Sequence, residues 1–121
     1  MRLSEVVQAL GLAVRAGGPG LEAEVAGGYA SDLMSDVIAN AEAGDLWVTV
    51  QVHANIVAVA AMKDLAGIVL AGGREPEPET LSKALAKKVP LLSSRLPVFE
   101  LAGRLYQLGF RGREGRGPGG V

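Results

Sequence analysis

The fold of this chain is decided by the stretch from residue 46 to residue 73, which reads LWVTVQVHANIVAVAAMKDLAGIVLAGG. Its first part, residues 46–50, is rich in β-branched and aromatic side chains and favours a strand. Residues 54–65 are apolar almost all round, which suits a helix packed on a sheet. Residues 67–70 form a continuous apolar run, typical of a buried parallel strand, and Gly72-Gly73 end it. The stretch therefore predicts a strand, a helix and a second strand of one parallel sheet.

The same alternation continues toward the carboxyl terminus. Pro76 and Pro78, which stand among three glutamates, predict the start of a helix that runs to Lys88. Residues 90–92 predict a short strand, and residues 97–108 predict a last helix with one apolar face. From residue 46 onward the order is therefore βαβαβα. This order implies an α/β fold with a mainly parallel sheet, flanked by helices that form right-handed crossovers.

A short helix and two strands are expected before residue 46. Ser4 is the expected N-cap of the helix, which ends at Gly11. Residues 12–15 and 24–30 predict the two strands. The pair Gly27-Gly28 inside the second strand indicates a bulge or the close approach of another backbone.

The chain is organised as one domain followed by a tail. Residues 31–40 carry apolar side chains at helical spacing, which adds one more helix before the central stretch. We expect a single α/β domain over residues 1–109. Residues 110–121 are rich in glycine and arginine and nearly free of apolar side chains, so we expect a disordered tail there.

Composition excludes several classes of protein. The chain has no cysteine, which removes disulfides, thiolate metal sites and cysteine nucleophiles, and its single histidine excludes a multi-histidine metal site. We therefore expect no metal and no cofactor. A net charge of −1 argues against a nucleic-acid binder, whose basic residues should dominate the domain.

The apolar segments argue against export and against a membrane span. Glu5 and Gln8 interrupt the region where a signal peptide needs an unbroken apolar stretch. The most apolar segment, residues 56–62, is far shorter than the roughly 20 residues that cross a bilayer. We expect a cytoplasmic protein that does not bind membranes.

Three common catalytic motifs are absent from the sequence. It has no phosphate-binding loop of the type GxxxxGK[ST], no complete dinucleotide fingerprint after Gly18-Pro19-Gly20, and no GxSxG nucleophile motif. We therefore expect a protein that is not an enzyme. A hydrolase or transferase that uses His53 as general base is the alternative.

Polar and glycine-rich residues follow three of the predicted strands. Because ligands bind at the carboxyl ends of strands in open α/β sheets, these residues are candidates for binding a small anionic ligand. The candidates are Gln51, His53, Asn55, Gly72, Gly73, Arg74, Ser93 and Ser94. His53 and Asn55 lie where a strand passes into a helix, whose free N–H groups suit an anion. Arg74 or Arg95 could offer a planar guanidinium to phosphate or carboxylate.

Each candidate also has a structural interpretation. His53 and Asn55 could cap a helix, Gly72-Gly73 could form a tight strand exit, and Ser93-Ser94 could cap the final helix. A further polar cluster of Asp32, Ser35 and Asp36 could hold a metal or line a dimer groove, or could be a solvated helix start.

The sequence resembles the DRTGG domain, a small α/β module. The resemblance rests on segments 68–76, 89–93 and 99–102, and it is strongest to short stand-alone members, which share segments like 51–55 and 28–33. With these segments it covers about residues 3 to 109. Val52-His53 stand where the family has Asp-Arg, and Ala71-Gly72-Gly73 where it has Thr-Gly-Gly. The amino-terminal domain of HPr kinase/phosphorylase is similar in outline, but the phosphate-loop kinase domain of that enzyme has no counterpart here.

The resemblance implies a regulatory or ligand-sensing module with no established reaction. It also implies a homodimer, which the scarcity of charges along residues 46–70 favours as well. The ligand could be a nucleotide. The alternative is an interaction or assembly protein, and some stand-alone members look as if they belong with redox and hydrogenase systems, which would supply the protein partner.

Overall fold

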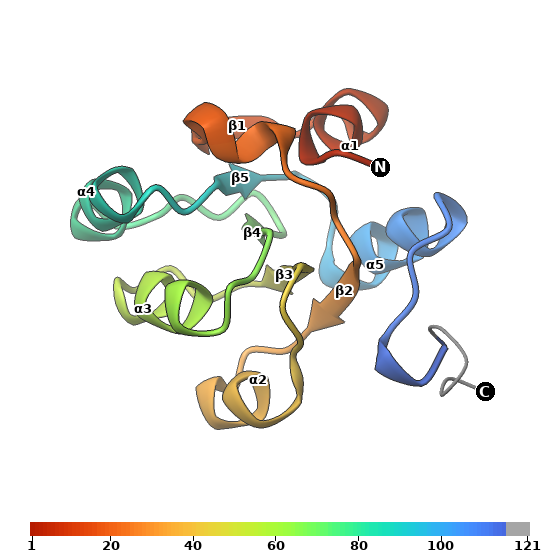
Figure 1. Ribbon diagram of the computed structural model, residues 1–121. Helices are drawn as coiled ribbons and strands as arrows, with labels where there is room; N and C mark the ends of the chain where they lie inside the picture. Colours follow the sequence, from red (N-terminus) through yellow and green to blue (C-terminus); the bar gives the residue numbers. More distant parts are fainter. Residues whose placement is uncertain (116–121) are drawn as a thin grey trace.

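The computed structural model describes residues 1–115, and within them five strands form one mixed sheet in the order β1-β5-β4-β3-β2 (Figure 1). The strands are β1 (Ala13–Ala16), β2 (Gly27–Ala30), β3 (Asp45–Thr49), β4 (Gly67–Leu70) and β5 (Leu91–Ser93). Strands β2 to β5 pair in parallel as successive neighbours, whereas β1 pairs antiparallel to β5. The predicted α/β fold, with βαβαβα from residue 46 after a short helix and two strands, is confirmed.

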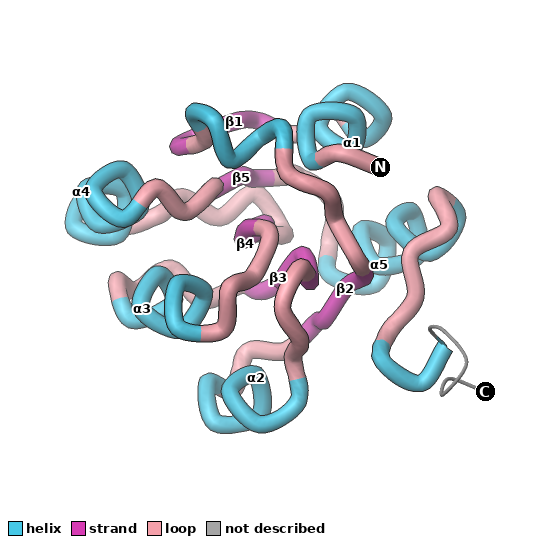
Figure 2. Tube along the Cα trace, in the orientation of Figure 1, coloured by secondary structure: helices cyan, strands magenta, loops and turns pink. Residues whose placement is uncertain are grey.

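Helices cover both faces of this sheet (Figure 2). They are α1 (Leu3–Leu10), α2 (Met34–Asn40), α3 (Asn55–Met62), α4 (Pro78–Lys87) and α5 (Val98–Gln107), with short 3₁₀ turns η1 (Gly18–Glu22) and η2 (Arg113–Gly115). Helices α2, α3 and α4 connect successive parallel strands, and right-handed crossovers in one direction place them on the same face. Helices α1 and α5 cover the opposite face.

The apolar runs of the central strands divide their side chains between two cores. All residues of β3 and β4 are buried. Trp47 and Ile68 pack beneath α2, α3 and α4, whereas Leu46 and Val69 pack beneath α1 and α5. The scarcity of charges along residues 46–70 therefore reflects burial inside the domain. It does not support a dimer interface.

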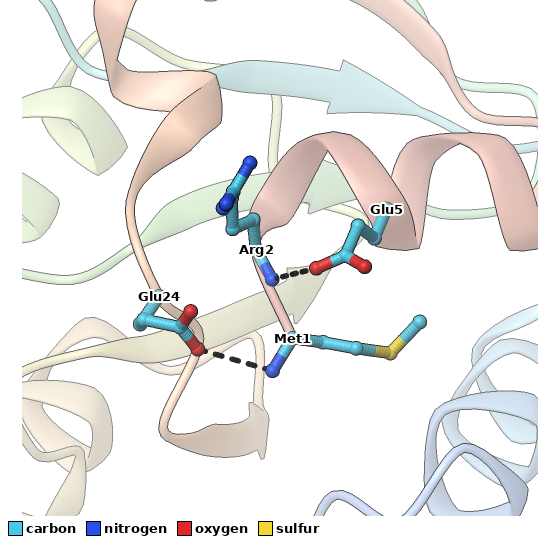
Figure 3. A network of polar contacts seen from close by, with 4 residues as sticks. All are labelled: Met1, Arg2, Glu5 and Glu24. Carbon is cyan, nitrogen blue, oxygen red and sulfur yellow. Dashed lines mark hydrogen bonds and ion pairs between the residues drawn. The ribbon is translucent and has the colours of Figure 1, made fainter.

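The start of α1 differs from the prediction. The helix begins at Leu3 with Arg2 as its N-cap, so Ser4 lies inside the first turn and the prediction that it caps the helix is wrong. The backbone N–H of Arg2 donates to Glu5 Oε1 at 2.8 Å, and the Met1 amino group lies 3.1 Å from Glu24 (Figure 3). Because Glu5 reaches back to the N-cap backbone, it places the N-cap at Arg2, two residues before the serine.

The end of the described chain lies along the edge strand β2. The backbone N–H of Gly28 donates to the carbonyl of Arg111 at 3.3 Å, so another backbone approaches the glycine pair, as predicted. The Arg111 guanidinium stacks 3.7 Å from the centroid of the Tyr106 ring. The structure therefore places residues 110–115 of the expected tail beside the domain. Residues 116–121 lie outside the residues that the structure describes.

Candidate functional site

The carboxyl ends of four parallel strands meet at one edge of the sheet, and two of their loops separate there. The loop after β4 leads to α4 on one face, whereas the loop after β5 leads to α5 on the other. Ligands of open α/β sheets bind at such points, where successive connections leave in opposite directions. A ligand site is therefore expected at the carboxyl ends of β4 and β5.

A pocket of about 520 Å³ opens at this place. Its polar lining comes from Arg15, Gly73, Glu75, Ser93, Ser94 and Arg95. Gly73, Ser93 and Ser94 belong to the predicted ligand-binding residues. Arg95 is one of the two arginines whose guanidinium the sequence offers to phosphate or carboxylate. Arg15 and Glu75 were not predicted. The volume lies within the range of about 300–1,000 Å³ that small-molecule sites usually have.

Arg15 reaches the pocket because of an irregularity in β1. Val14 pairs with Leu92 and Ala16 with Leu91, so Arg15 is the extra residue of a β-bulge. Bulges turn a side chain away from the regular alternation of a strand. Arg15 Nε donates to Ser93 Oγ at 3.1 Å, and Arg15 Nη2 lies 2.7 Å from Glu75 Oε1. The guanidinium is therefore held between β5 and the loop after β4.

Ser93 and Ser94 line the pocket, and the hydroxyl of each accepts one hydrogen bond from the protein. Ser93 and Ser94 are 6% and 8% exposed. Ser93 Oγ accepts from Arg15, and Ser94 Oγ accepts from the Leu96 N–H at 3.1 Å. A hydroxyl that already accepts a hydrogen bond can still donate one. The final helix begins after Pro97 as N-cap, so these serines do not cap it.

The glycine pair joins the two loops through its backbone. The N–H of Gly72 donates to Leu96 O and that of Gly73 to Ser94 O, both at 2.8 Å. Both glycines have a left-handed backbone, with φ of +71° and +72°, which side chains rarely adopt. The glycine pair therefore forms the tight exit from β4. Its two backbone N–H groups already donate to the carbonyl groups of Leu96 and Ser94.

The remaining predicted residues lie at the same sheet edge but outside the pocket lining. Gln51 Nε2 donates to Asp32 O at 3.3 Å, and His53 Nδ1 lies 2.8 Å from Glu77 Oε2. Asn55 is the first residue of α3, whose N-cap is Ala54, so neither His53 nor Asn55 caps that helix. Arg74 is exposed. The structure therefore separates the predicted set into a group around β5 and a group around the β3–α3 loop.

Asp32 accepts hydrogen bonds at the carboxyl end of β3. Its Oδ1 accepts from Thr49 Oγ1 at 2.7 Å and from the Val50 N–H at 2.9 Å. Thr49 is fully buried. Within residues 1–115, no three His, Asp or Glu side chains gather to hold a metal ion. The position of Asp32 is that of a structural acceptor that joins the β2–α2 loop to β3.

Replacing Asp32 with alanine should lower the free energy of unfolding by about 1–2 kcal/mol, because the buried Thr49 hydroxyl loses its acceptor. Urea denaturation followed by circular dichroism measures the loss. Asp32→Asn is the matched control, since it keeps an oxygen for Thr49 and should cost less. Equal stability of Asp32→Ala and the parent protein would contradict this role.

Asp36 belongs to a second polar group, beside edge strand β2. The Tyr29 hydroxyl donates to both Asp36 oxygens at 2.9 and 2.8 Å, and Asn40 Nδ2 donates to Oδ1 at 2.9 Å. Hydrogen bonds from Ser31, Tyr29 and Asn40 lower the pKa of Asp36. Burial, followed by the contact with Asp36, raises the pKa of Tyr29. The hydrogen bonds with Tyr29 connect α2 to β2, so they give Asp36 a structural role.

The described residues contain no helix with the length and apolar character needed to cross a bilayer.

Comparison with known proteins adds information on the fold. No family model matches the chain, and no curated protein matches it either.

Among solved structures, the fold is similar to a chain that holds the CBS and DRTGG domains of the regulatory region of Clostridium perfringens pyrophosphatase, in complex with its activator diadenosine tetraphosphate. The TM-score is 0.71 at 15% sequence identity, and the match covers 86% of this chain and 45% of that chain. At this identity the likeness concerns the fold alone. The predicted resemblance to DRTGG domain proteins is confirmed as a likeness of fold to a chain that contains such a domain.

Proposed function

We propose that this protein is a non-catalytic regulatory module that senses a small anionic ligand, such as a nucleotide or pyrophosphate. The observation that carries the proposal is the pocket at the carboxyl ends of β4 and β5, where Arg15, Arg95 and two serine hydroxyls converge. Guanidinium groups and hydroxyl donors suit phosphate and carboxylate oxygens. The fold likeness supports the same class, since the similar region is regulatory and binds a nucleotide activator.

The side chains around the pocket favour binding over catalysis. Ser93 and Ser94 accept hydrogen bonds from Arg15 and from a backbone N–H, and neither contacts a general base among the described residues. His53 lies outside the lining and is paired with Glu77. A nucleophile needs a base within hydrogen-bond reach, so His53 is poorly placed to activate either serine.

Isothermal titration calorimetry with pyrophosphate, ATP and diadenosine tetraphosphate tests the proposal. We expect at least one of them to bind with a Kd below about 1 mM, which is about −4 kcal/mol. The affinity should fall steeply as the sodium chloride concentration is raised, because the contact is between charges. If none of the three binds, the sensing function is wrong.

The exposed face of α5 supports a homodimer through this helix. Phe99 is 85% exposed and Tyr106 is 59% exposed, and their spacing of two turns puts them on one face. In an antiparallel pair of α5 helices, Phe99 of one copy would meet Tyr106 of the other. Glu100 would then lie beside Arg104 of the second copy, which makes the charges self-complementary.

Light scattering should therefore give about twice the chain mass of 12.4 kDa, and Phe99→Ser should shift the protein to a monomer. The change removes a large apolar contact from each side of the interface. Met62→Ser is the matched control, since Met62 is 60% exposed but lies on α3, on the opposite face. A parent protein that is monomeric at all concentrations would contradict the homodimer.

The same face also fits the second candidate, an assembly protein that docks on a partner such as a component of a redox or hydrogenase system. The pair of Phe99 and Tyr106 on one face of α5 is the observation that favours it, because exposed apolar patches mark interaction sites. A partner that co-purifies with His53→Ala and Asn55→Ala variants but not with Phe99→Ser would favour docking over sensing.

A further inference from the structure

The Arg15 guanidinium in the pocket is already bound to an anion of the protein itself. Glu75 Oε1 lies 2.7 Å from Arg15 Nη2, and Arg15 Nε donates to Ser93 at 3.1 Å. We propose that Glu75 occupies the anion site in the free protein, and that a diphosphate group displaces its carboxylate from Arg15 and thereby releases the part of the β4–α4 loop between the backbone hydrogen bonds of Gly73 and Glu77. This inference rests on the proposed sensing function, since it specifies the ligand class and the response of the same pocket.

The two contacts of Arg15 differ in strength and exposure. Ser93 is 6% exposed and belongs to β5, so the Arg15–Ser93 hydrogen bond holds the guanidinium in place. The Glu75 side chain is 65% exposed and lies in the loop before α4. Exposed ion pairs contribute little to stability. A ligand with several anionic oxygens can therefore replace Glu75 while Arg15 stays oriented.

The donors of the pocket fit a diphosphate group. A guanidinium carries five N–H donors, and the structure gives Arg95 no hydrogen-bond or ion-pair partner among residues 1–115. With Glu75 displaced, Arg15, Arg95 and the hydroxyls of Ser93 and Ser94 offer more donors than a single carboxylate can accept. The C-terminal end of α1, at Leu10, also lines the pocket and carries partial negative charge. The anionic group should therefore sit toward Arg15 and Arg95.

The lining also decides which part of a nucleotide is recognised. No aromatic side chain among residues 1–115 lines this pocket. A nucleobase would have no ring on which to stack, so the diphosphate supplies the contacts. Free pyrophosphate and the diphosphate of a nucleotide share this chemistry, and the affinities of the parent protein for pyrophosphate and for ADP show which of the two sources binds more tightly.

The β4–α4 loop connects Glu75 to the neighbouring β3–α3 loop. Two residues after Glu75, the Glu77 N–H donates to Val52 O at 3.2 Å, and Thr80 Oγ1 donates to the same oxygen at 2.6 Å. The Glu77 carboxylate contacts His53 at 2.8 Å. Movement of Glu75 therefore changes the surroundings of His53, which lies outside the pocket.

Calorimetric titration of pyrophosphate into the parent protein, Glu75→Gln and Glu79→Gln tests the displacement. Glu75→Gln should bind about tenfold more tightly, because it removes the competing carboxylate and its repulsion of the ligand. Glu79→Gln is the matched control: it removes the same charge from an exposed side chain of α4 outside the pocket. Its affinity should stay within about twofold of the parent protein. Titration with ADP should give the same rank order if the diphosphate is what binds.

The two proposals fail in different ways. If pyrophosphate binds the parent protein and Glu75→Gln with equal affinity, the displacement is wrong and the sensing function stands. If pyrophosphate and ADP bind neither the parent protein nor Glu75→Gln, the displacement is wrong, and the sensing function is wrong as well if ATP and diadenosine tetraphosphate also fail to bind.

Nuclear magnetic resonance of the single histidine reports on the loop. Saturation with pyrophosphate should shift the imidazole resonances of His53 in the parent protein. Glu75→Gln should show part of this shift without ligand, because its loop is already released. Unchanged His53 resonances in the saturated parent protein would overturn the release of the loop.

Discussion

Truncation of Trp47 to alanine is expected to lower the free energy of unfolding by about 3–5 kcal/mol. Trp47 is fully buried in the central part of the sheet, where it packs beneath α2 and α3. Its Nε1 also donates to the carbonyl of Ser31 at 2.8 Å, so it holds the β2–α2 loop against β3. Since natural domains have only about 5–15 kcal/mol of stability, this one change should remove a large share of it.

Trp47→Phe separates the two contributions of this residue. Phenylalanine keeps most of the buried apolar surface but cannot donate to Ser31, so its cost should be about 1–2 kcal/mol. Far-ultraviolet circular dichroism in urea measures both variants, because the only tryptophan of the chain is lost as a fluorescent probe. A cost below about 1 kcal/mol for Trp47→Ala would mean that this core tolerates a large cavity, contrary to its close packing.

The strands and helices could be predicted because their signals are local. Residues 67–70 are apolar without interruption since β4 is buried on both faces, and Gly72-Gly73 end it because both residues need a left-handed backbone. The start of α4 is likewise marked by Pro78, its first residue. Such signals depend only on neighbouring residues along the chain, so they can be recognised in one sequence before the fold is known.

The pocket was only half predicted, because its other half depends on pairing between distant segments. Arg15 lies 78 residues from Ser93 and 60 residues from Glu75 in the sequence. It enters the pocket only because β1 pairs antiparallel to β5 with a bulge at that position. A lone arginine in a four-residue strand carries no sign of that pairing. Conversely, Arg74 comes only four residues after the end of β4 in the sequence, but lies outside the lining.

Loss of charge from both pocket arginines should abolish the sensing function. The double variant Arg15→Gln, Arg95→Gln is expected to bind pyrophosphate at least about 100-fold more weakly, because hydrogen bonds to charged groups contribute about 1.5–3 kcal/mol each and 1.4 kcal/mol is tenfold in affinity. The two single variants apportion the effect between Arg15, which is held by Ser93, and Arg95, which has no partner among the described residues. Calorimetry measures the affinity, and thermal unfolding checks that each variant is folded.

Arg74→Gln decides between the two groups of residues at this sheet edge. It removes the same charge from a side chain beside the pocket, and its affinity should match that of the parent protein within about twofold if the ligand lies between β1, β5 and the β4–α4 loop. If Arg74→Gln instead weakens binding while Arg95→Gln does not, the ligand lies over the β4–α4 loop outside the pocket. The sequence-based set would then describe the site better than the pocket does. Binding that depends on Arg15 cannot be explained in that way, because Arg15 contacts β5 and the β4–α4 loop.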